Sequence, residues 1–338
     1  MDRKRLIASL TLALLIVVGT AFGLYAAGRR AELSAGGEGT VRGDLSGRFK
    51  EPRTVVYDGW EYRYRNDLTT VLFMGVDRVT EGNPAKSDFR NGGQSDFLLL
   101  LVIDPQKQTI TSIQIDRDTM AEITILSVLG NPAGTRNAQI CLSHGFGDGG
   151  EQSCLFTVDA VSKHLYGVDI DFYVAMNLDG IPVLNEALGG VTVTLEDDFS
   201  QLDPAMRVGE TLTLHGKQAE YYVRYRMGVG EGTNTSRMVR QKEYLSQAGT
   251  IVDEKVHHNA NFVGSLFDTL KRELITNMSR GRMINEAYAS RNYTRTGPIS
   301  PLGEHTIGDD GFVEFHADES ALEKLVLDIF FEPVAASS

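Results

Sequence analysis

Cysteine is scarce in this chain of 338 residues, which contains only Cys141 and Cys154. The two are too far apart for a C-x-x-C pair, so the sequence holds no cysteine pattern typical of a structural zinc site. In an exported protein the pair could form a disulfide that closes a short loop. Two free, buried thiols are the alternative, and the spacing of the cysteines does not exclude it.

Several catalytic and binding motifs are also absent. No G-x-x-x-x-G-K-[ST] segment occurs, which excludes a P-loop nucleotide site, and no G-x-S-x-G segment supports a serine hydrolase. The seven histidines show no H-x-x-x-H zinc pattern. Basic residues are outnumbered by acidic ones, and the formal net charge of −12 argues against a general nucleic-acid-binding protein.

Long hydrophobic runs are limited to one, residues 6–28, which are 23 uncharged residues in succession. At about 1.5 Å per residue this run is long enough for a hydrocarbon core of about 30 Å. Basic residues at 3–5 and 29–30 flank it, and the positive-inside rule predicts a cytoplasmic N-terminus with the rest exported. We expect an uncleaved, single-pass anchor in the cell membrane. A cleaved signal peptide is the alternative, and a buried core helix is disfavoured because the run has no polar stripe.

The remainder of the chain has an ordinary globular composition and alternating strand and helix signals. Continuous apolar runs at Thr70–Val76 and Phe97–Ile103 predict buried strands, and Thr109–Ile115 reads as a hairpin partner of the second run. This alternation predicts an α/β fold with three α/β/α layers and a mixed central sheet, preceded by the transmembrane helix. We expect four segments: residues 1–30 as stub and anchor, 31–67 as linker and leading strands, 68–255 as the core, and 256–338 as C-terminal helices and a strand completing the same domain.

Helix boundaries and further strands follow from capping and periodicity signals. Ser153 and Ser236 are candidate N-caps for helices over Cys154–Tyr166 and Ser236–Val252. The other predicted elements are a strand or hairpin at Val55–Arg65, strands at Asp171–Met176, Val191–Leu195 and Gly311–His316, and helices at Leu178–Leu188, His215–Tyr222, Phe262–Leu274, Gly281–Tyr288 and Ser320–Phe331.

Acidic residues gather at the ends of the predicted strands. Asp77 follows the first buried strand, Asp96 precedes the second, and Asp116 and Asp118 follow the third. If the first and third strands run parallel, these carboxylates share one edge of the sheet. Carboxylate oxygens suit Mg²⁺, which takes one or two carboxylates together with phosphate. A single aspartate would more commonly serve as a turn residue or as an ion-pair partner.

A second cluster, residues 221–240, is rich in arginine within an acidic chain. Its basic residues are Arg224, Arg226, Arg237 and Arg240, and Glu231 is its only acid. Arg237, Arg240 and Gln241 share one face of a predicted helix start, where free N–H groups favour an anion. Guanidinium groups suit bidentate contact with phosphate. Carboxylates for a metal beside an arginine cluster indicate a pyrophosphate site, and a solvated basic face is the alternative.

Taken together, these segments resemble the LytR-CpsA-Psr family. The matching stretches, in the order of the family, are VLFMGVDR (71–78), GQSDFLLLLVID (93–104), SIQIDRDT (112–119), RNAQICLSHGFGDGG (136–150), the span 168–193, GETLTLHGKQAEYYVRYR (209–226) and SRMVRQ (236–241). The resemblance implies an α/β/α fold and an extracytoplasmic enzyme behind one membrane helix. It also implies transfer of a glycopolymer, such as a teichoic acid or a capsule polymer, from a polyprenyl-pyrophosphate carrier to peptidoglycan.

The same resemblance implies a set of site residues. Asp77 and Asp96 match the metal-site aspartates for Mg²⁺ or Mn²⁺, and Arg117 matches the arginine of the S-I-P-R-D-T segment. With Asp118, residues Asp77 and Arg117 are the expected catalytic residues. The expected phosphate-binding residues are Arg117, Arg136 (where the family often has lysine), Arg224, Arg226, Arg237, Arg240 and Gln241. A pyrophosphatase side activity would use the same residues.

Three positions depart from the family pattern. Gln94 replaces the arginine of R-S-D, Asp116 replaces the proline of S-I-P-R-D, and Asn234 replaces the acid common before G-R. These changes redistribute charge around the expected site. They favour, as an alternative, a non-catalytic protein that only holds polyprenyl phosphates. A transcriptional regulator is a further alternative, which the acidic charge and the expected anchor oppose.

Overall fold

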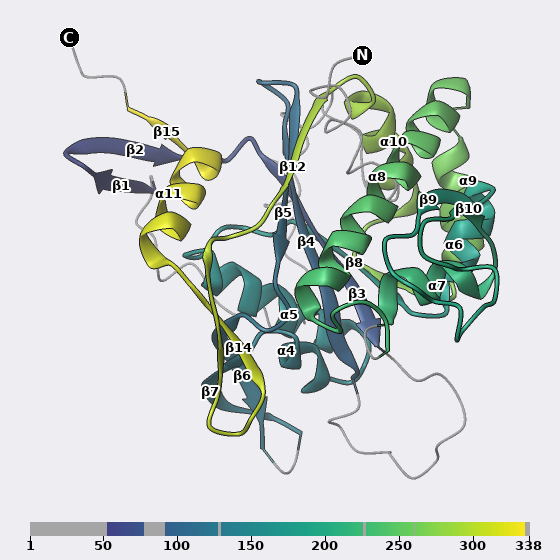
Figure 1. Cartoon of the computed structure of the whole chain (residues 1–338). Helices are drawn as coiled ribbons and strands as arrows, with labels where there is room; N and C mark the ends of the chain where they lie inside the picture. The colour runs from purple at the N-terminus through teal and green to yellow at the C-terminus, as the bar shows by residue number, and fades with distance from the viewer. Residues whose placement is uncertain (1–52, 78–91, 128–129, 226–227, 260, 335–338) are drawn as a thin grey trace.

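The computed structural model describes residues 53–77, 92–127, 130–225, 228–259 and 261–334. The predicted membrane helix at residues 6–28 lies outside the described residues. Among the helices that the structure describes, none is both long and apolar enough to cross a membrane. The described part is a mixed α/β fold built on one central sheet (Figure 1).

The central sheet has six strands in the order β11-β8-β3-β4-β5-β12. Their bounds are β3 Thr69–Asp77, β4 Gln94–Asp104, β5 Thr109–Ile115, β8 Phe172–Asn177, β11 Leu274–Thr276 and β12 Thr294–Ile299. β4 runs antiparallel to both β3 and β5, whereas β8 is parallel to β3 and β12 is parallel to β5. β3 and β5 are therefore parallel to each other, as the placement of the acidic residues required.

The central strands are apolar along their whole length because both faces of the sheet are covered. Leu72, Leu98 and Leu100 belong to one buried core, and their neighbours Phe73 and Leu99 belong to the other. Alternation of side chains across a strand assigns these two sets to opposite faces. Strands buried on both faces read as continuous hydrophobic runs, which is why the sequence signal here was strong.

Helices cover each face in a separate layer, on either side of the sheet in Figure 1. The first face is covered by α6 Gly180–Leu188, α7 Lys217–Arg224, α8 Asn234–His258, α9 Phe262–Leu270 and α10 Arg280–Ser290. The opposite face is covered by α4 Leu142–Gly145, α5 Glu151–His164 and α11 Glu319–Phe330. The first face holds the cavity described below, and we call it the cavity face.

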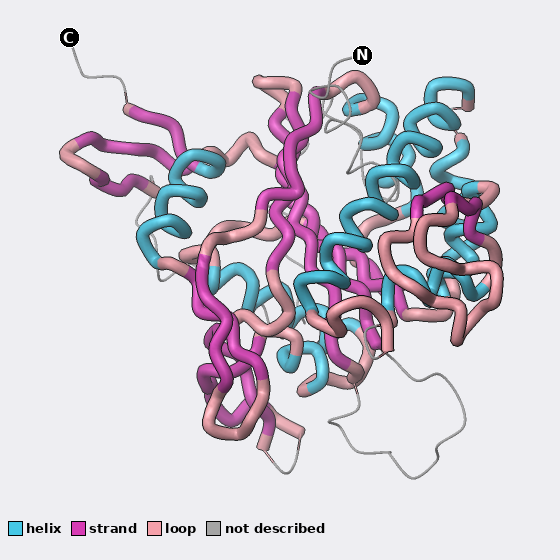
Figure 2. Tube along the Cα trace, viewed as in Figure 1, coloured by secondary structure: helices cyan, strands magenta, loops and turns pink. Residues whose placement is uncertain are grey.

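Four smaller sheets lie outside the central one, and their strands are among the magenta segments of Figure 2. They are β1 Thr54–Tyr57 with β2 Trp60–Tyr64 and β15 Phe331–Pro333; β6 Met120–Leu126 with β7 Pro132–Gln139; β9 Val191–Thr194 with β10 Thr211–Leu214; and β13 Gly303–Ile307 with β14 Val313–Ala317. The hairpins β6–β7 and β13–β14 lie side by side, joined by a parallel bridge from Thr119 to Phe315.

The two predicted N-caps, Ser153 and Ser236, are wrong. α5 begins at Glu151 after Gly150, and the Ser153 hydroxyl accepts a hydrogen bond from the Gly149 N–H instead of capping a later start. α8 begins at Asn234, where the Thr233 side chain accepts from the Ser236 N–H. In both cases an earlier residue takes the cap position.

The predicted helix at residues 262–274 ends at Leu270, because the segment from Leu274 pairs with β8 as β11. Cys141 and Cys154 are both free and buried, so the two thiols do not form a disulfide.

Candidate active site

The candidate site lies at the edge of the sheet where β3 ends, β4 begins and β5 ends. The pairing register shifts between Gly75 and Val76, which leaves Asp96 as an extra residue in β4. Such a β-bulge redirects side chains, and here both Asp96 and Phe97 line one cavity. Gly75 permits the close approach, because a Cβ at that position would lie 3.0 Å from the Phe97 Cβ.

Asp96 lies between two arginines that come from distant parts of the chain. Arg117, which follows β5, donates through Nη1 to Asp96 Oδ1. Arg237, in the first turn of α8, places Nη1 3.5 Å from Asp96 Oδ2. The Arg237 side chain is 3% exposed and that of Arg117 is 13% exposed. An anion that displaced Asp96 would meet donors from both of these nearly buried guanidinium groups.

Arg117 is fixed by three further contacts. Its Nη2 donates to Gln94 Oε1 at 2.7 Å and lies 3.4 Å from Cys141 Sγ, and its Nε donates to Asp118 Oδ1 at 3.2 Å. Burial raises the pKa of the Cys141 thiol to about 12. Cys141 therefore stays neutral at physiological pH, and only Asp96 and Asp118 offset the charge of Arg117 within this set of contacts.

The second arginine–aspartate pair of the site is more open to solvent. Arg224, the last residue of α7, donates through Nη2 to Asp77 Oδ1 at 3.2 Å and through Nη1 to Glu220 Oε1 at 3.0 Å. The side chains of Arg224 and Asp77 are 39% and 37% exposed. An ion pair this exposed contributes about 1 kcal/mol or less, so a phosphate ligand can replace it at low cost.

Gln241 and Arg240, neighbours on α8, lie in different surroundings. Gln241 donates to the Val223 carbonyl at 3.2 Å and lines the cavity. Arg240 donates to the carbonyls of Tyr222 and Tyr225, at 2.9 and 2.6 Å. Carbonyls at a helix end are favourable partners for a cation. Arg240 thus connects the end of α7 to α8, and it is not among the cavity-lining residues. Its phosphate-binding role stays a prediction without geometric support.

Arg226 and Arg136 are the two other predicted phosphate-binding residues. Arg226 lies outside the described residues. Arg136 is exposed on β7, with its guanidinium carbon 6.0 Å from the ring centroid of Phe146. Arg136 is not among the residues that line the cavity.

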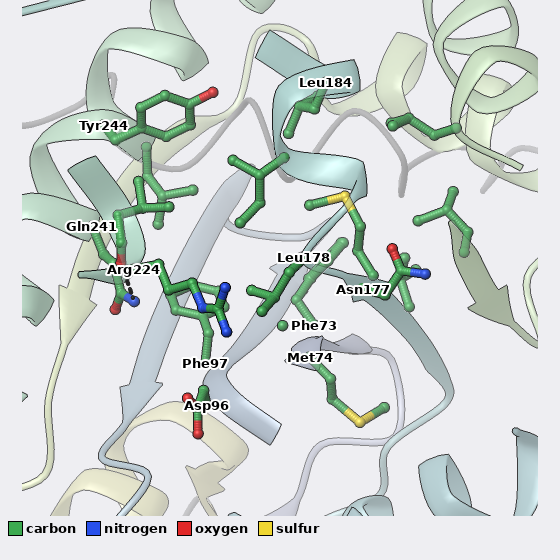
Figure 3. A pocket seen from close by; sticks show the side chains of 18 of the residues that line it. Phe73, Met74, Asp96, Phe97, Asn177, Leu178, Leu184, Arg224, Gln241 and Tyr244 are labelled. Atoms are coloured by element: carbon green, nitrogen blue, oxygen red, sulfur yellow. Dashed lines mark hydrogen bonds between the residues drawn. The ribbon is translucent and has the colours of Figure 1, made fainter. Parts of the chain in front are cut away.

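An apolar cavity begins at the charged cluster and extends between the sheet and the helices of the cavity face (Figure 3). Asp96 and Arg224 lie toward one end of it, and Leu184 and Tyr244 lie at the other. Its apolar lining is Phe73, Phe97, Val174, Met176, Leu178, Ile181, Leu184, Val223, Tyr244, Leu245, Leu270 and Leu274. Arg237 and Gln241 complete the polar end. We call Asp96, Arg224, Arg237 and Gln241, with Asp77 and Arg117 bonded to them, the charged mouth.

The carboxylates of the charged mouth could hold a metal ion only together with phosphate oxygens of a ligand. Within the described residues, no group of three or more His, Cys, Asp or Glu side chains could hold a metal ion alone. Mg²⁺ needs only one or two carboxylates when phosphate oxygens complete its shell. Asp77, which is partly exposed, and Asp96, which lines the cavity, supply that number.

Two features of this region carry no signal in the sequence. The cavity lining comes from β3, β4, β8, β11 and four helices, so no single segment shows it. His305, on β13, places Nε2 3.1 Å from Asp116 Oδ2, although it lies far from the matching motifs. A lone histidine in an exposed hairpin has no sequence context that would identify such a contact.

Comparison with known proteins gives a family match and named relatives. A model of the LytR_cpsA_psr family matches residues 49–310. TagU of Halalkalibacterium halodurans is 29% identical over 242 residues, which cover 70% of this chain and 67% of the relative. TagV of Bacillus subtilis is 25% identical over 340 residues, which cover 95% and 76%. Both relatives are named polyisoprenyl-teichoic acid–peptidoglycan teichoic acid transferases.

Solved structures share the fold. A Streptococcus agalactiae protein superposes with a TM-score of 0.63 at 21% identity, covering 78% of this chain and 86% of the other. The crystal structure of B. subtilis TagV gives a TM-score of 0.56 at 22% identity, covering 78% and 96%. At these identities the likeness supports the mixed α/β architecture alone.

Proposed function

The chain belongs to the LytR-CpsA-Psr family, and from that premise we propose that it transfers a glycopolymer from a polyprenyl-pyrophosphate carrier to peptidoglycan. The observation that carries this proposal is the continuity between the apolar cavity and the charged mouth. A polyprenyl pyrophosphate has the same two parts, an apolar chain and an anionic head. The names of TagU and TagV support a teichoic acid as one candidate polymer.

The arginines of the charged mouth would bind the pyrophosphate. Arg117 and Arg237 share Asp96, and Arg224 pairs with Asp77, so all three arginines of the ligand-free site already contact a carboxylate. A pyrophosphate would take over donors that now face Asp77 and Asp96. Planar guanidinium groups bind phosphate oxygens in pairs, which fixes the orientation of the head group. Arg226 and Arg136 remain candidates for contacts with the sugar-linked end.

Asp77 and Asp96 are the proposed ligands of Mg²⁺ or Mn²⁺, each freed when an arginine turns to the phosphate. When bound, the metal would supply positive charge beside the pyrophosphate oxygens. Two carboxylates with phosphate oxygens are a donor set that suits these hard cations better than nitrogen or sulfur would.

The chemical step is a displacement at phosphorus. The oxygen of a peptidoglycan hydroxyl forms a bond to the sugar-linked phosphorus, the bond from that phosphorus to the bridging oxygen breaks, and polyprenyl monophosphate leaves. Asp118 is our candidate to accept the hydroxyl proton, because its contact with Arg117 Nε places its carboxylate beside the charged mouth. Arg117 and Arg237 would stabilise the charge that develops on the phosphate oxygens. Water in place of the hydroxyl would give the pyrophosphatase side activity.

The proposed substrate also agrees with the expected location. A lipid-linked donor is embedded in a membrane, and residues 6–28 would anchor the enzyme beside it with the catalytic domain on the extracytoplasmic side. Mass spectrometry of the mature N-terminus would separate this anchor from a cleaved signal peptide.

The test uses the purified full chain in detergent, with a lipid-linked donor, Mg²⁺ and peptidoglycan. We expect a covalent polymer–peptidoglycan product, and about a 100-fold slower transfer for Arg117→Ala and Arg237→Ala. Arg63→Ala is the matched control, because Arg63 forms an exposed ion pair with Glu332 outside the charged mouth. Binding of the donor without formation of any product would show that the protein is a non-catalytic carrier of polyprenyl phosphates and not an enzyme. Transfer at the wild-type rate by both site variants would show that the site is assigned wrongly.

A further inference from the structure

A buried aspartate outside the proposed reaction lies at the centre of a hydrogen-bond network. Asp116 is 7% exposed, and its Oδ1 accepts from the Asn234 Nδ2 at 2.8 Å and from the Asp118 N–H at 2.9 Å. Its Oδ2 lies 3.1 Å from His305 Nε2. Asn234 in turn accepts through Oδ1 from Arg237 Nη2 at 2.6 Å. The network therefore connects the C-terminal hairpin to an arginine of the charged mouth.

The hairpin that carries His305 is also hydrogen-bonded to the loop that follows β5 and to β7. The Phe315 N–H donates to the Asp118 carbonyl at 2.8 Å, and Gln139 Nε2 donates to the Val313 carbonyl at 2.6 Å. The His305 ring also packs against Phe315, with 4.9 Å between ring centroids. β13–β14 thus holds Asp116 from the side opposite to α8.

The negative charge of Asp116 lies beside a helix start that contains a cation. The first turn of α8 contains no acidic residue, although it contains Arg237 and the free N–H groups of the helix start. A cation in the first turn of a helix is unfavourable unless an anion lies nearby. Asp116, at the end of β5, supplies that negative charge. It is connected to Arg237 through the Asn234 amide, which donates to Asp116 and accepts from Arg237.

We propose that Asp116, Asn234 and His305 are positioning residues that hold Arg237 in the orientation needed to bind the pyrophosphate. This inference rests on the proposed function for the identity of the anion. Asn234 acts as the bridge, because its two amide atoms contact the acid and the arginine at once. His305 holds the far oxygen of Asp116, so a hairpin distant in sequence completes the charged mouth.

An exchange of the acid and the amide tests this arrangement in the full-length protein. Asp116→Asn removes the charge but keeps a polar side chain, and we expect about 10-fold weaker binding of geranylgeranyl pyrophosphate. Asn234→Asp places two carboxylates in contact, and we expect about 100-fold weaker binding. The double variant, Asp116→Asn with Asn234→Asp, restores one acid hydrogen-bonded to one amide, and we expect affinity within about 3-fold of wild type.

Further variants separate positioning from general stability. His305→Gln keeps a donor for Asp116 and should be close to wild type, whereas His305→Ala should weaken binding about 5-fold at an unchanged melting temperature. Asp309→Asn, on the exposed turn of the same hairpin, controls for charge alone. A double variant no better than Asn234→Asp, or single variants that bind like wild type, would overturn the proposal.

The binding readout also separates this inference from the proposed function. A protein that binds the probe but never transfers polymer would contradict the proposed transferase activity. The exchange of Asp116 and Asn234 would still test whether the hydrogen-bond network positions Arg237. A wild-type protein that does not bind the probe would overturn both.

Discussion

The two faces of the central sheet are made from neighbouring residues of the same strands, yet they are packed for different purposes. On the opposite face, Leu72, Leu98 and Leu100 are fully buried beneath α5 and α11. On the cavity face, Phe73, Phe97 and Val174 line a space that continues to the charged mouth. One face therefore serves stability, and we infer that the other gives up part of its packing to admit a lipid chain.

Adjacent residues of β4 give the sharpest test of this difference. Leu98 lies on the opposite face and Phe97 on the cavity face. Leu98→Ala should lower the free energy of unfolding by about 4 kcal/mol, because it removes a fully buried side chain and leaves a void. Phe97→Ala should cost about 2 kcal/mol, since its ring already borders a cavity, and should weaken lipid binding as well. Denaturant unfolding measures both, and equal losses would mean that the two faces are packed alike.

A half-buried histidine makes the opposite face sensitive to acid. Burial on α5 lowers the pKa of His164 to about 4, and its Nε2 is buried with no hydrogen-bond partner among the described residues. The unfolded chain takes up a proton near pH 6.5, whereas the folded protein does so only near pH 4. Stability from the neutral ring is therefore complete above pH 6.5 and is lost as the pH falls toward 4, by about 3 kcal/mol.

The measurement is unfolding by denaturant between pH 7 and pH 4, for the wild type and for His164→Gln. Gln does not titrate, so the difference between the two proteins should shrink by about 3 kcal/mol over this range. A constant difference would show that the ring is protonated in the folded state as easily as in the unfolded chain.

The strand ends of the site could be predicted from the sequence, and the bulge could not. Asp77 follows a continuous apolar run, and Arg117 lies just after the predicted strand Thr109–Ile115. The short turn between the second and third predicted strands accounts for the antiparallel pairing of those two strands. The bulge at Asp96 depends on which residue of β3 pairs with which residue of β4. The sequence of either strand alone does not predict that register.

The misjudged elements have similar causes. Two competing cap residues lie within a few positions of each other at the start of α8, and packing decides between them. The strands β7 and β13 are largely exposed and lack the alternation of a half-buried strand, so the hairpins β6–β7 and β13–β14 were not predicted, although the predicted strand at Gly311–His316 corresponds to β14. Arg240 matched a motif as well as Arg237 did, and only its contacts with two backbone carbonyls distinguish the two.

Removing Arg224 should separate activity from stability at the charged mouth. Arg224→Ala should slow transfer about 100-fold, since it would remove a phosphate ligand. It should change the free energy of unfolding by less than about 0.5 kcal/mol, because its pair with Asp77 is exposed. Arg63→Ala, at the comparably exposed pair with Glu332, should alter neither quantity strongly. If Arg224→Ala lowered the free energy of unfolding by more than about 2 kcal/mol, the charged mouth would have a structural role instead.

Adding volume to each face tests the comparison from the other direction. Ala160, fully buried on α5, has no room for a larger side chain, so Ala160→Leu should cost about 2 kcal/mol of stability. Leu178→Trp, by contrast, extends a side chain into the cavity and should change stability by less than about 0.5 kcal/mol. The same change should weaken geranylgeranyl pyrophosphate binding about 10-fold, whereas inorganic pyrophosphate, which has no chain to accommodate, should bind to Leu178→Trp as it does to the wild type. If Leu178→Trp weakened both ligands equally, the tryptophan would be disturbing the charged mouth, and the lipid chain would have to lie somewhere other than the cavity.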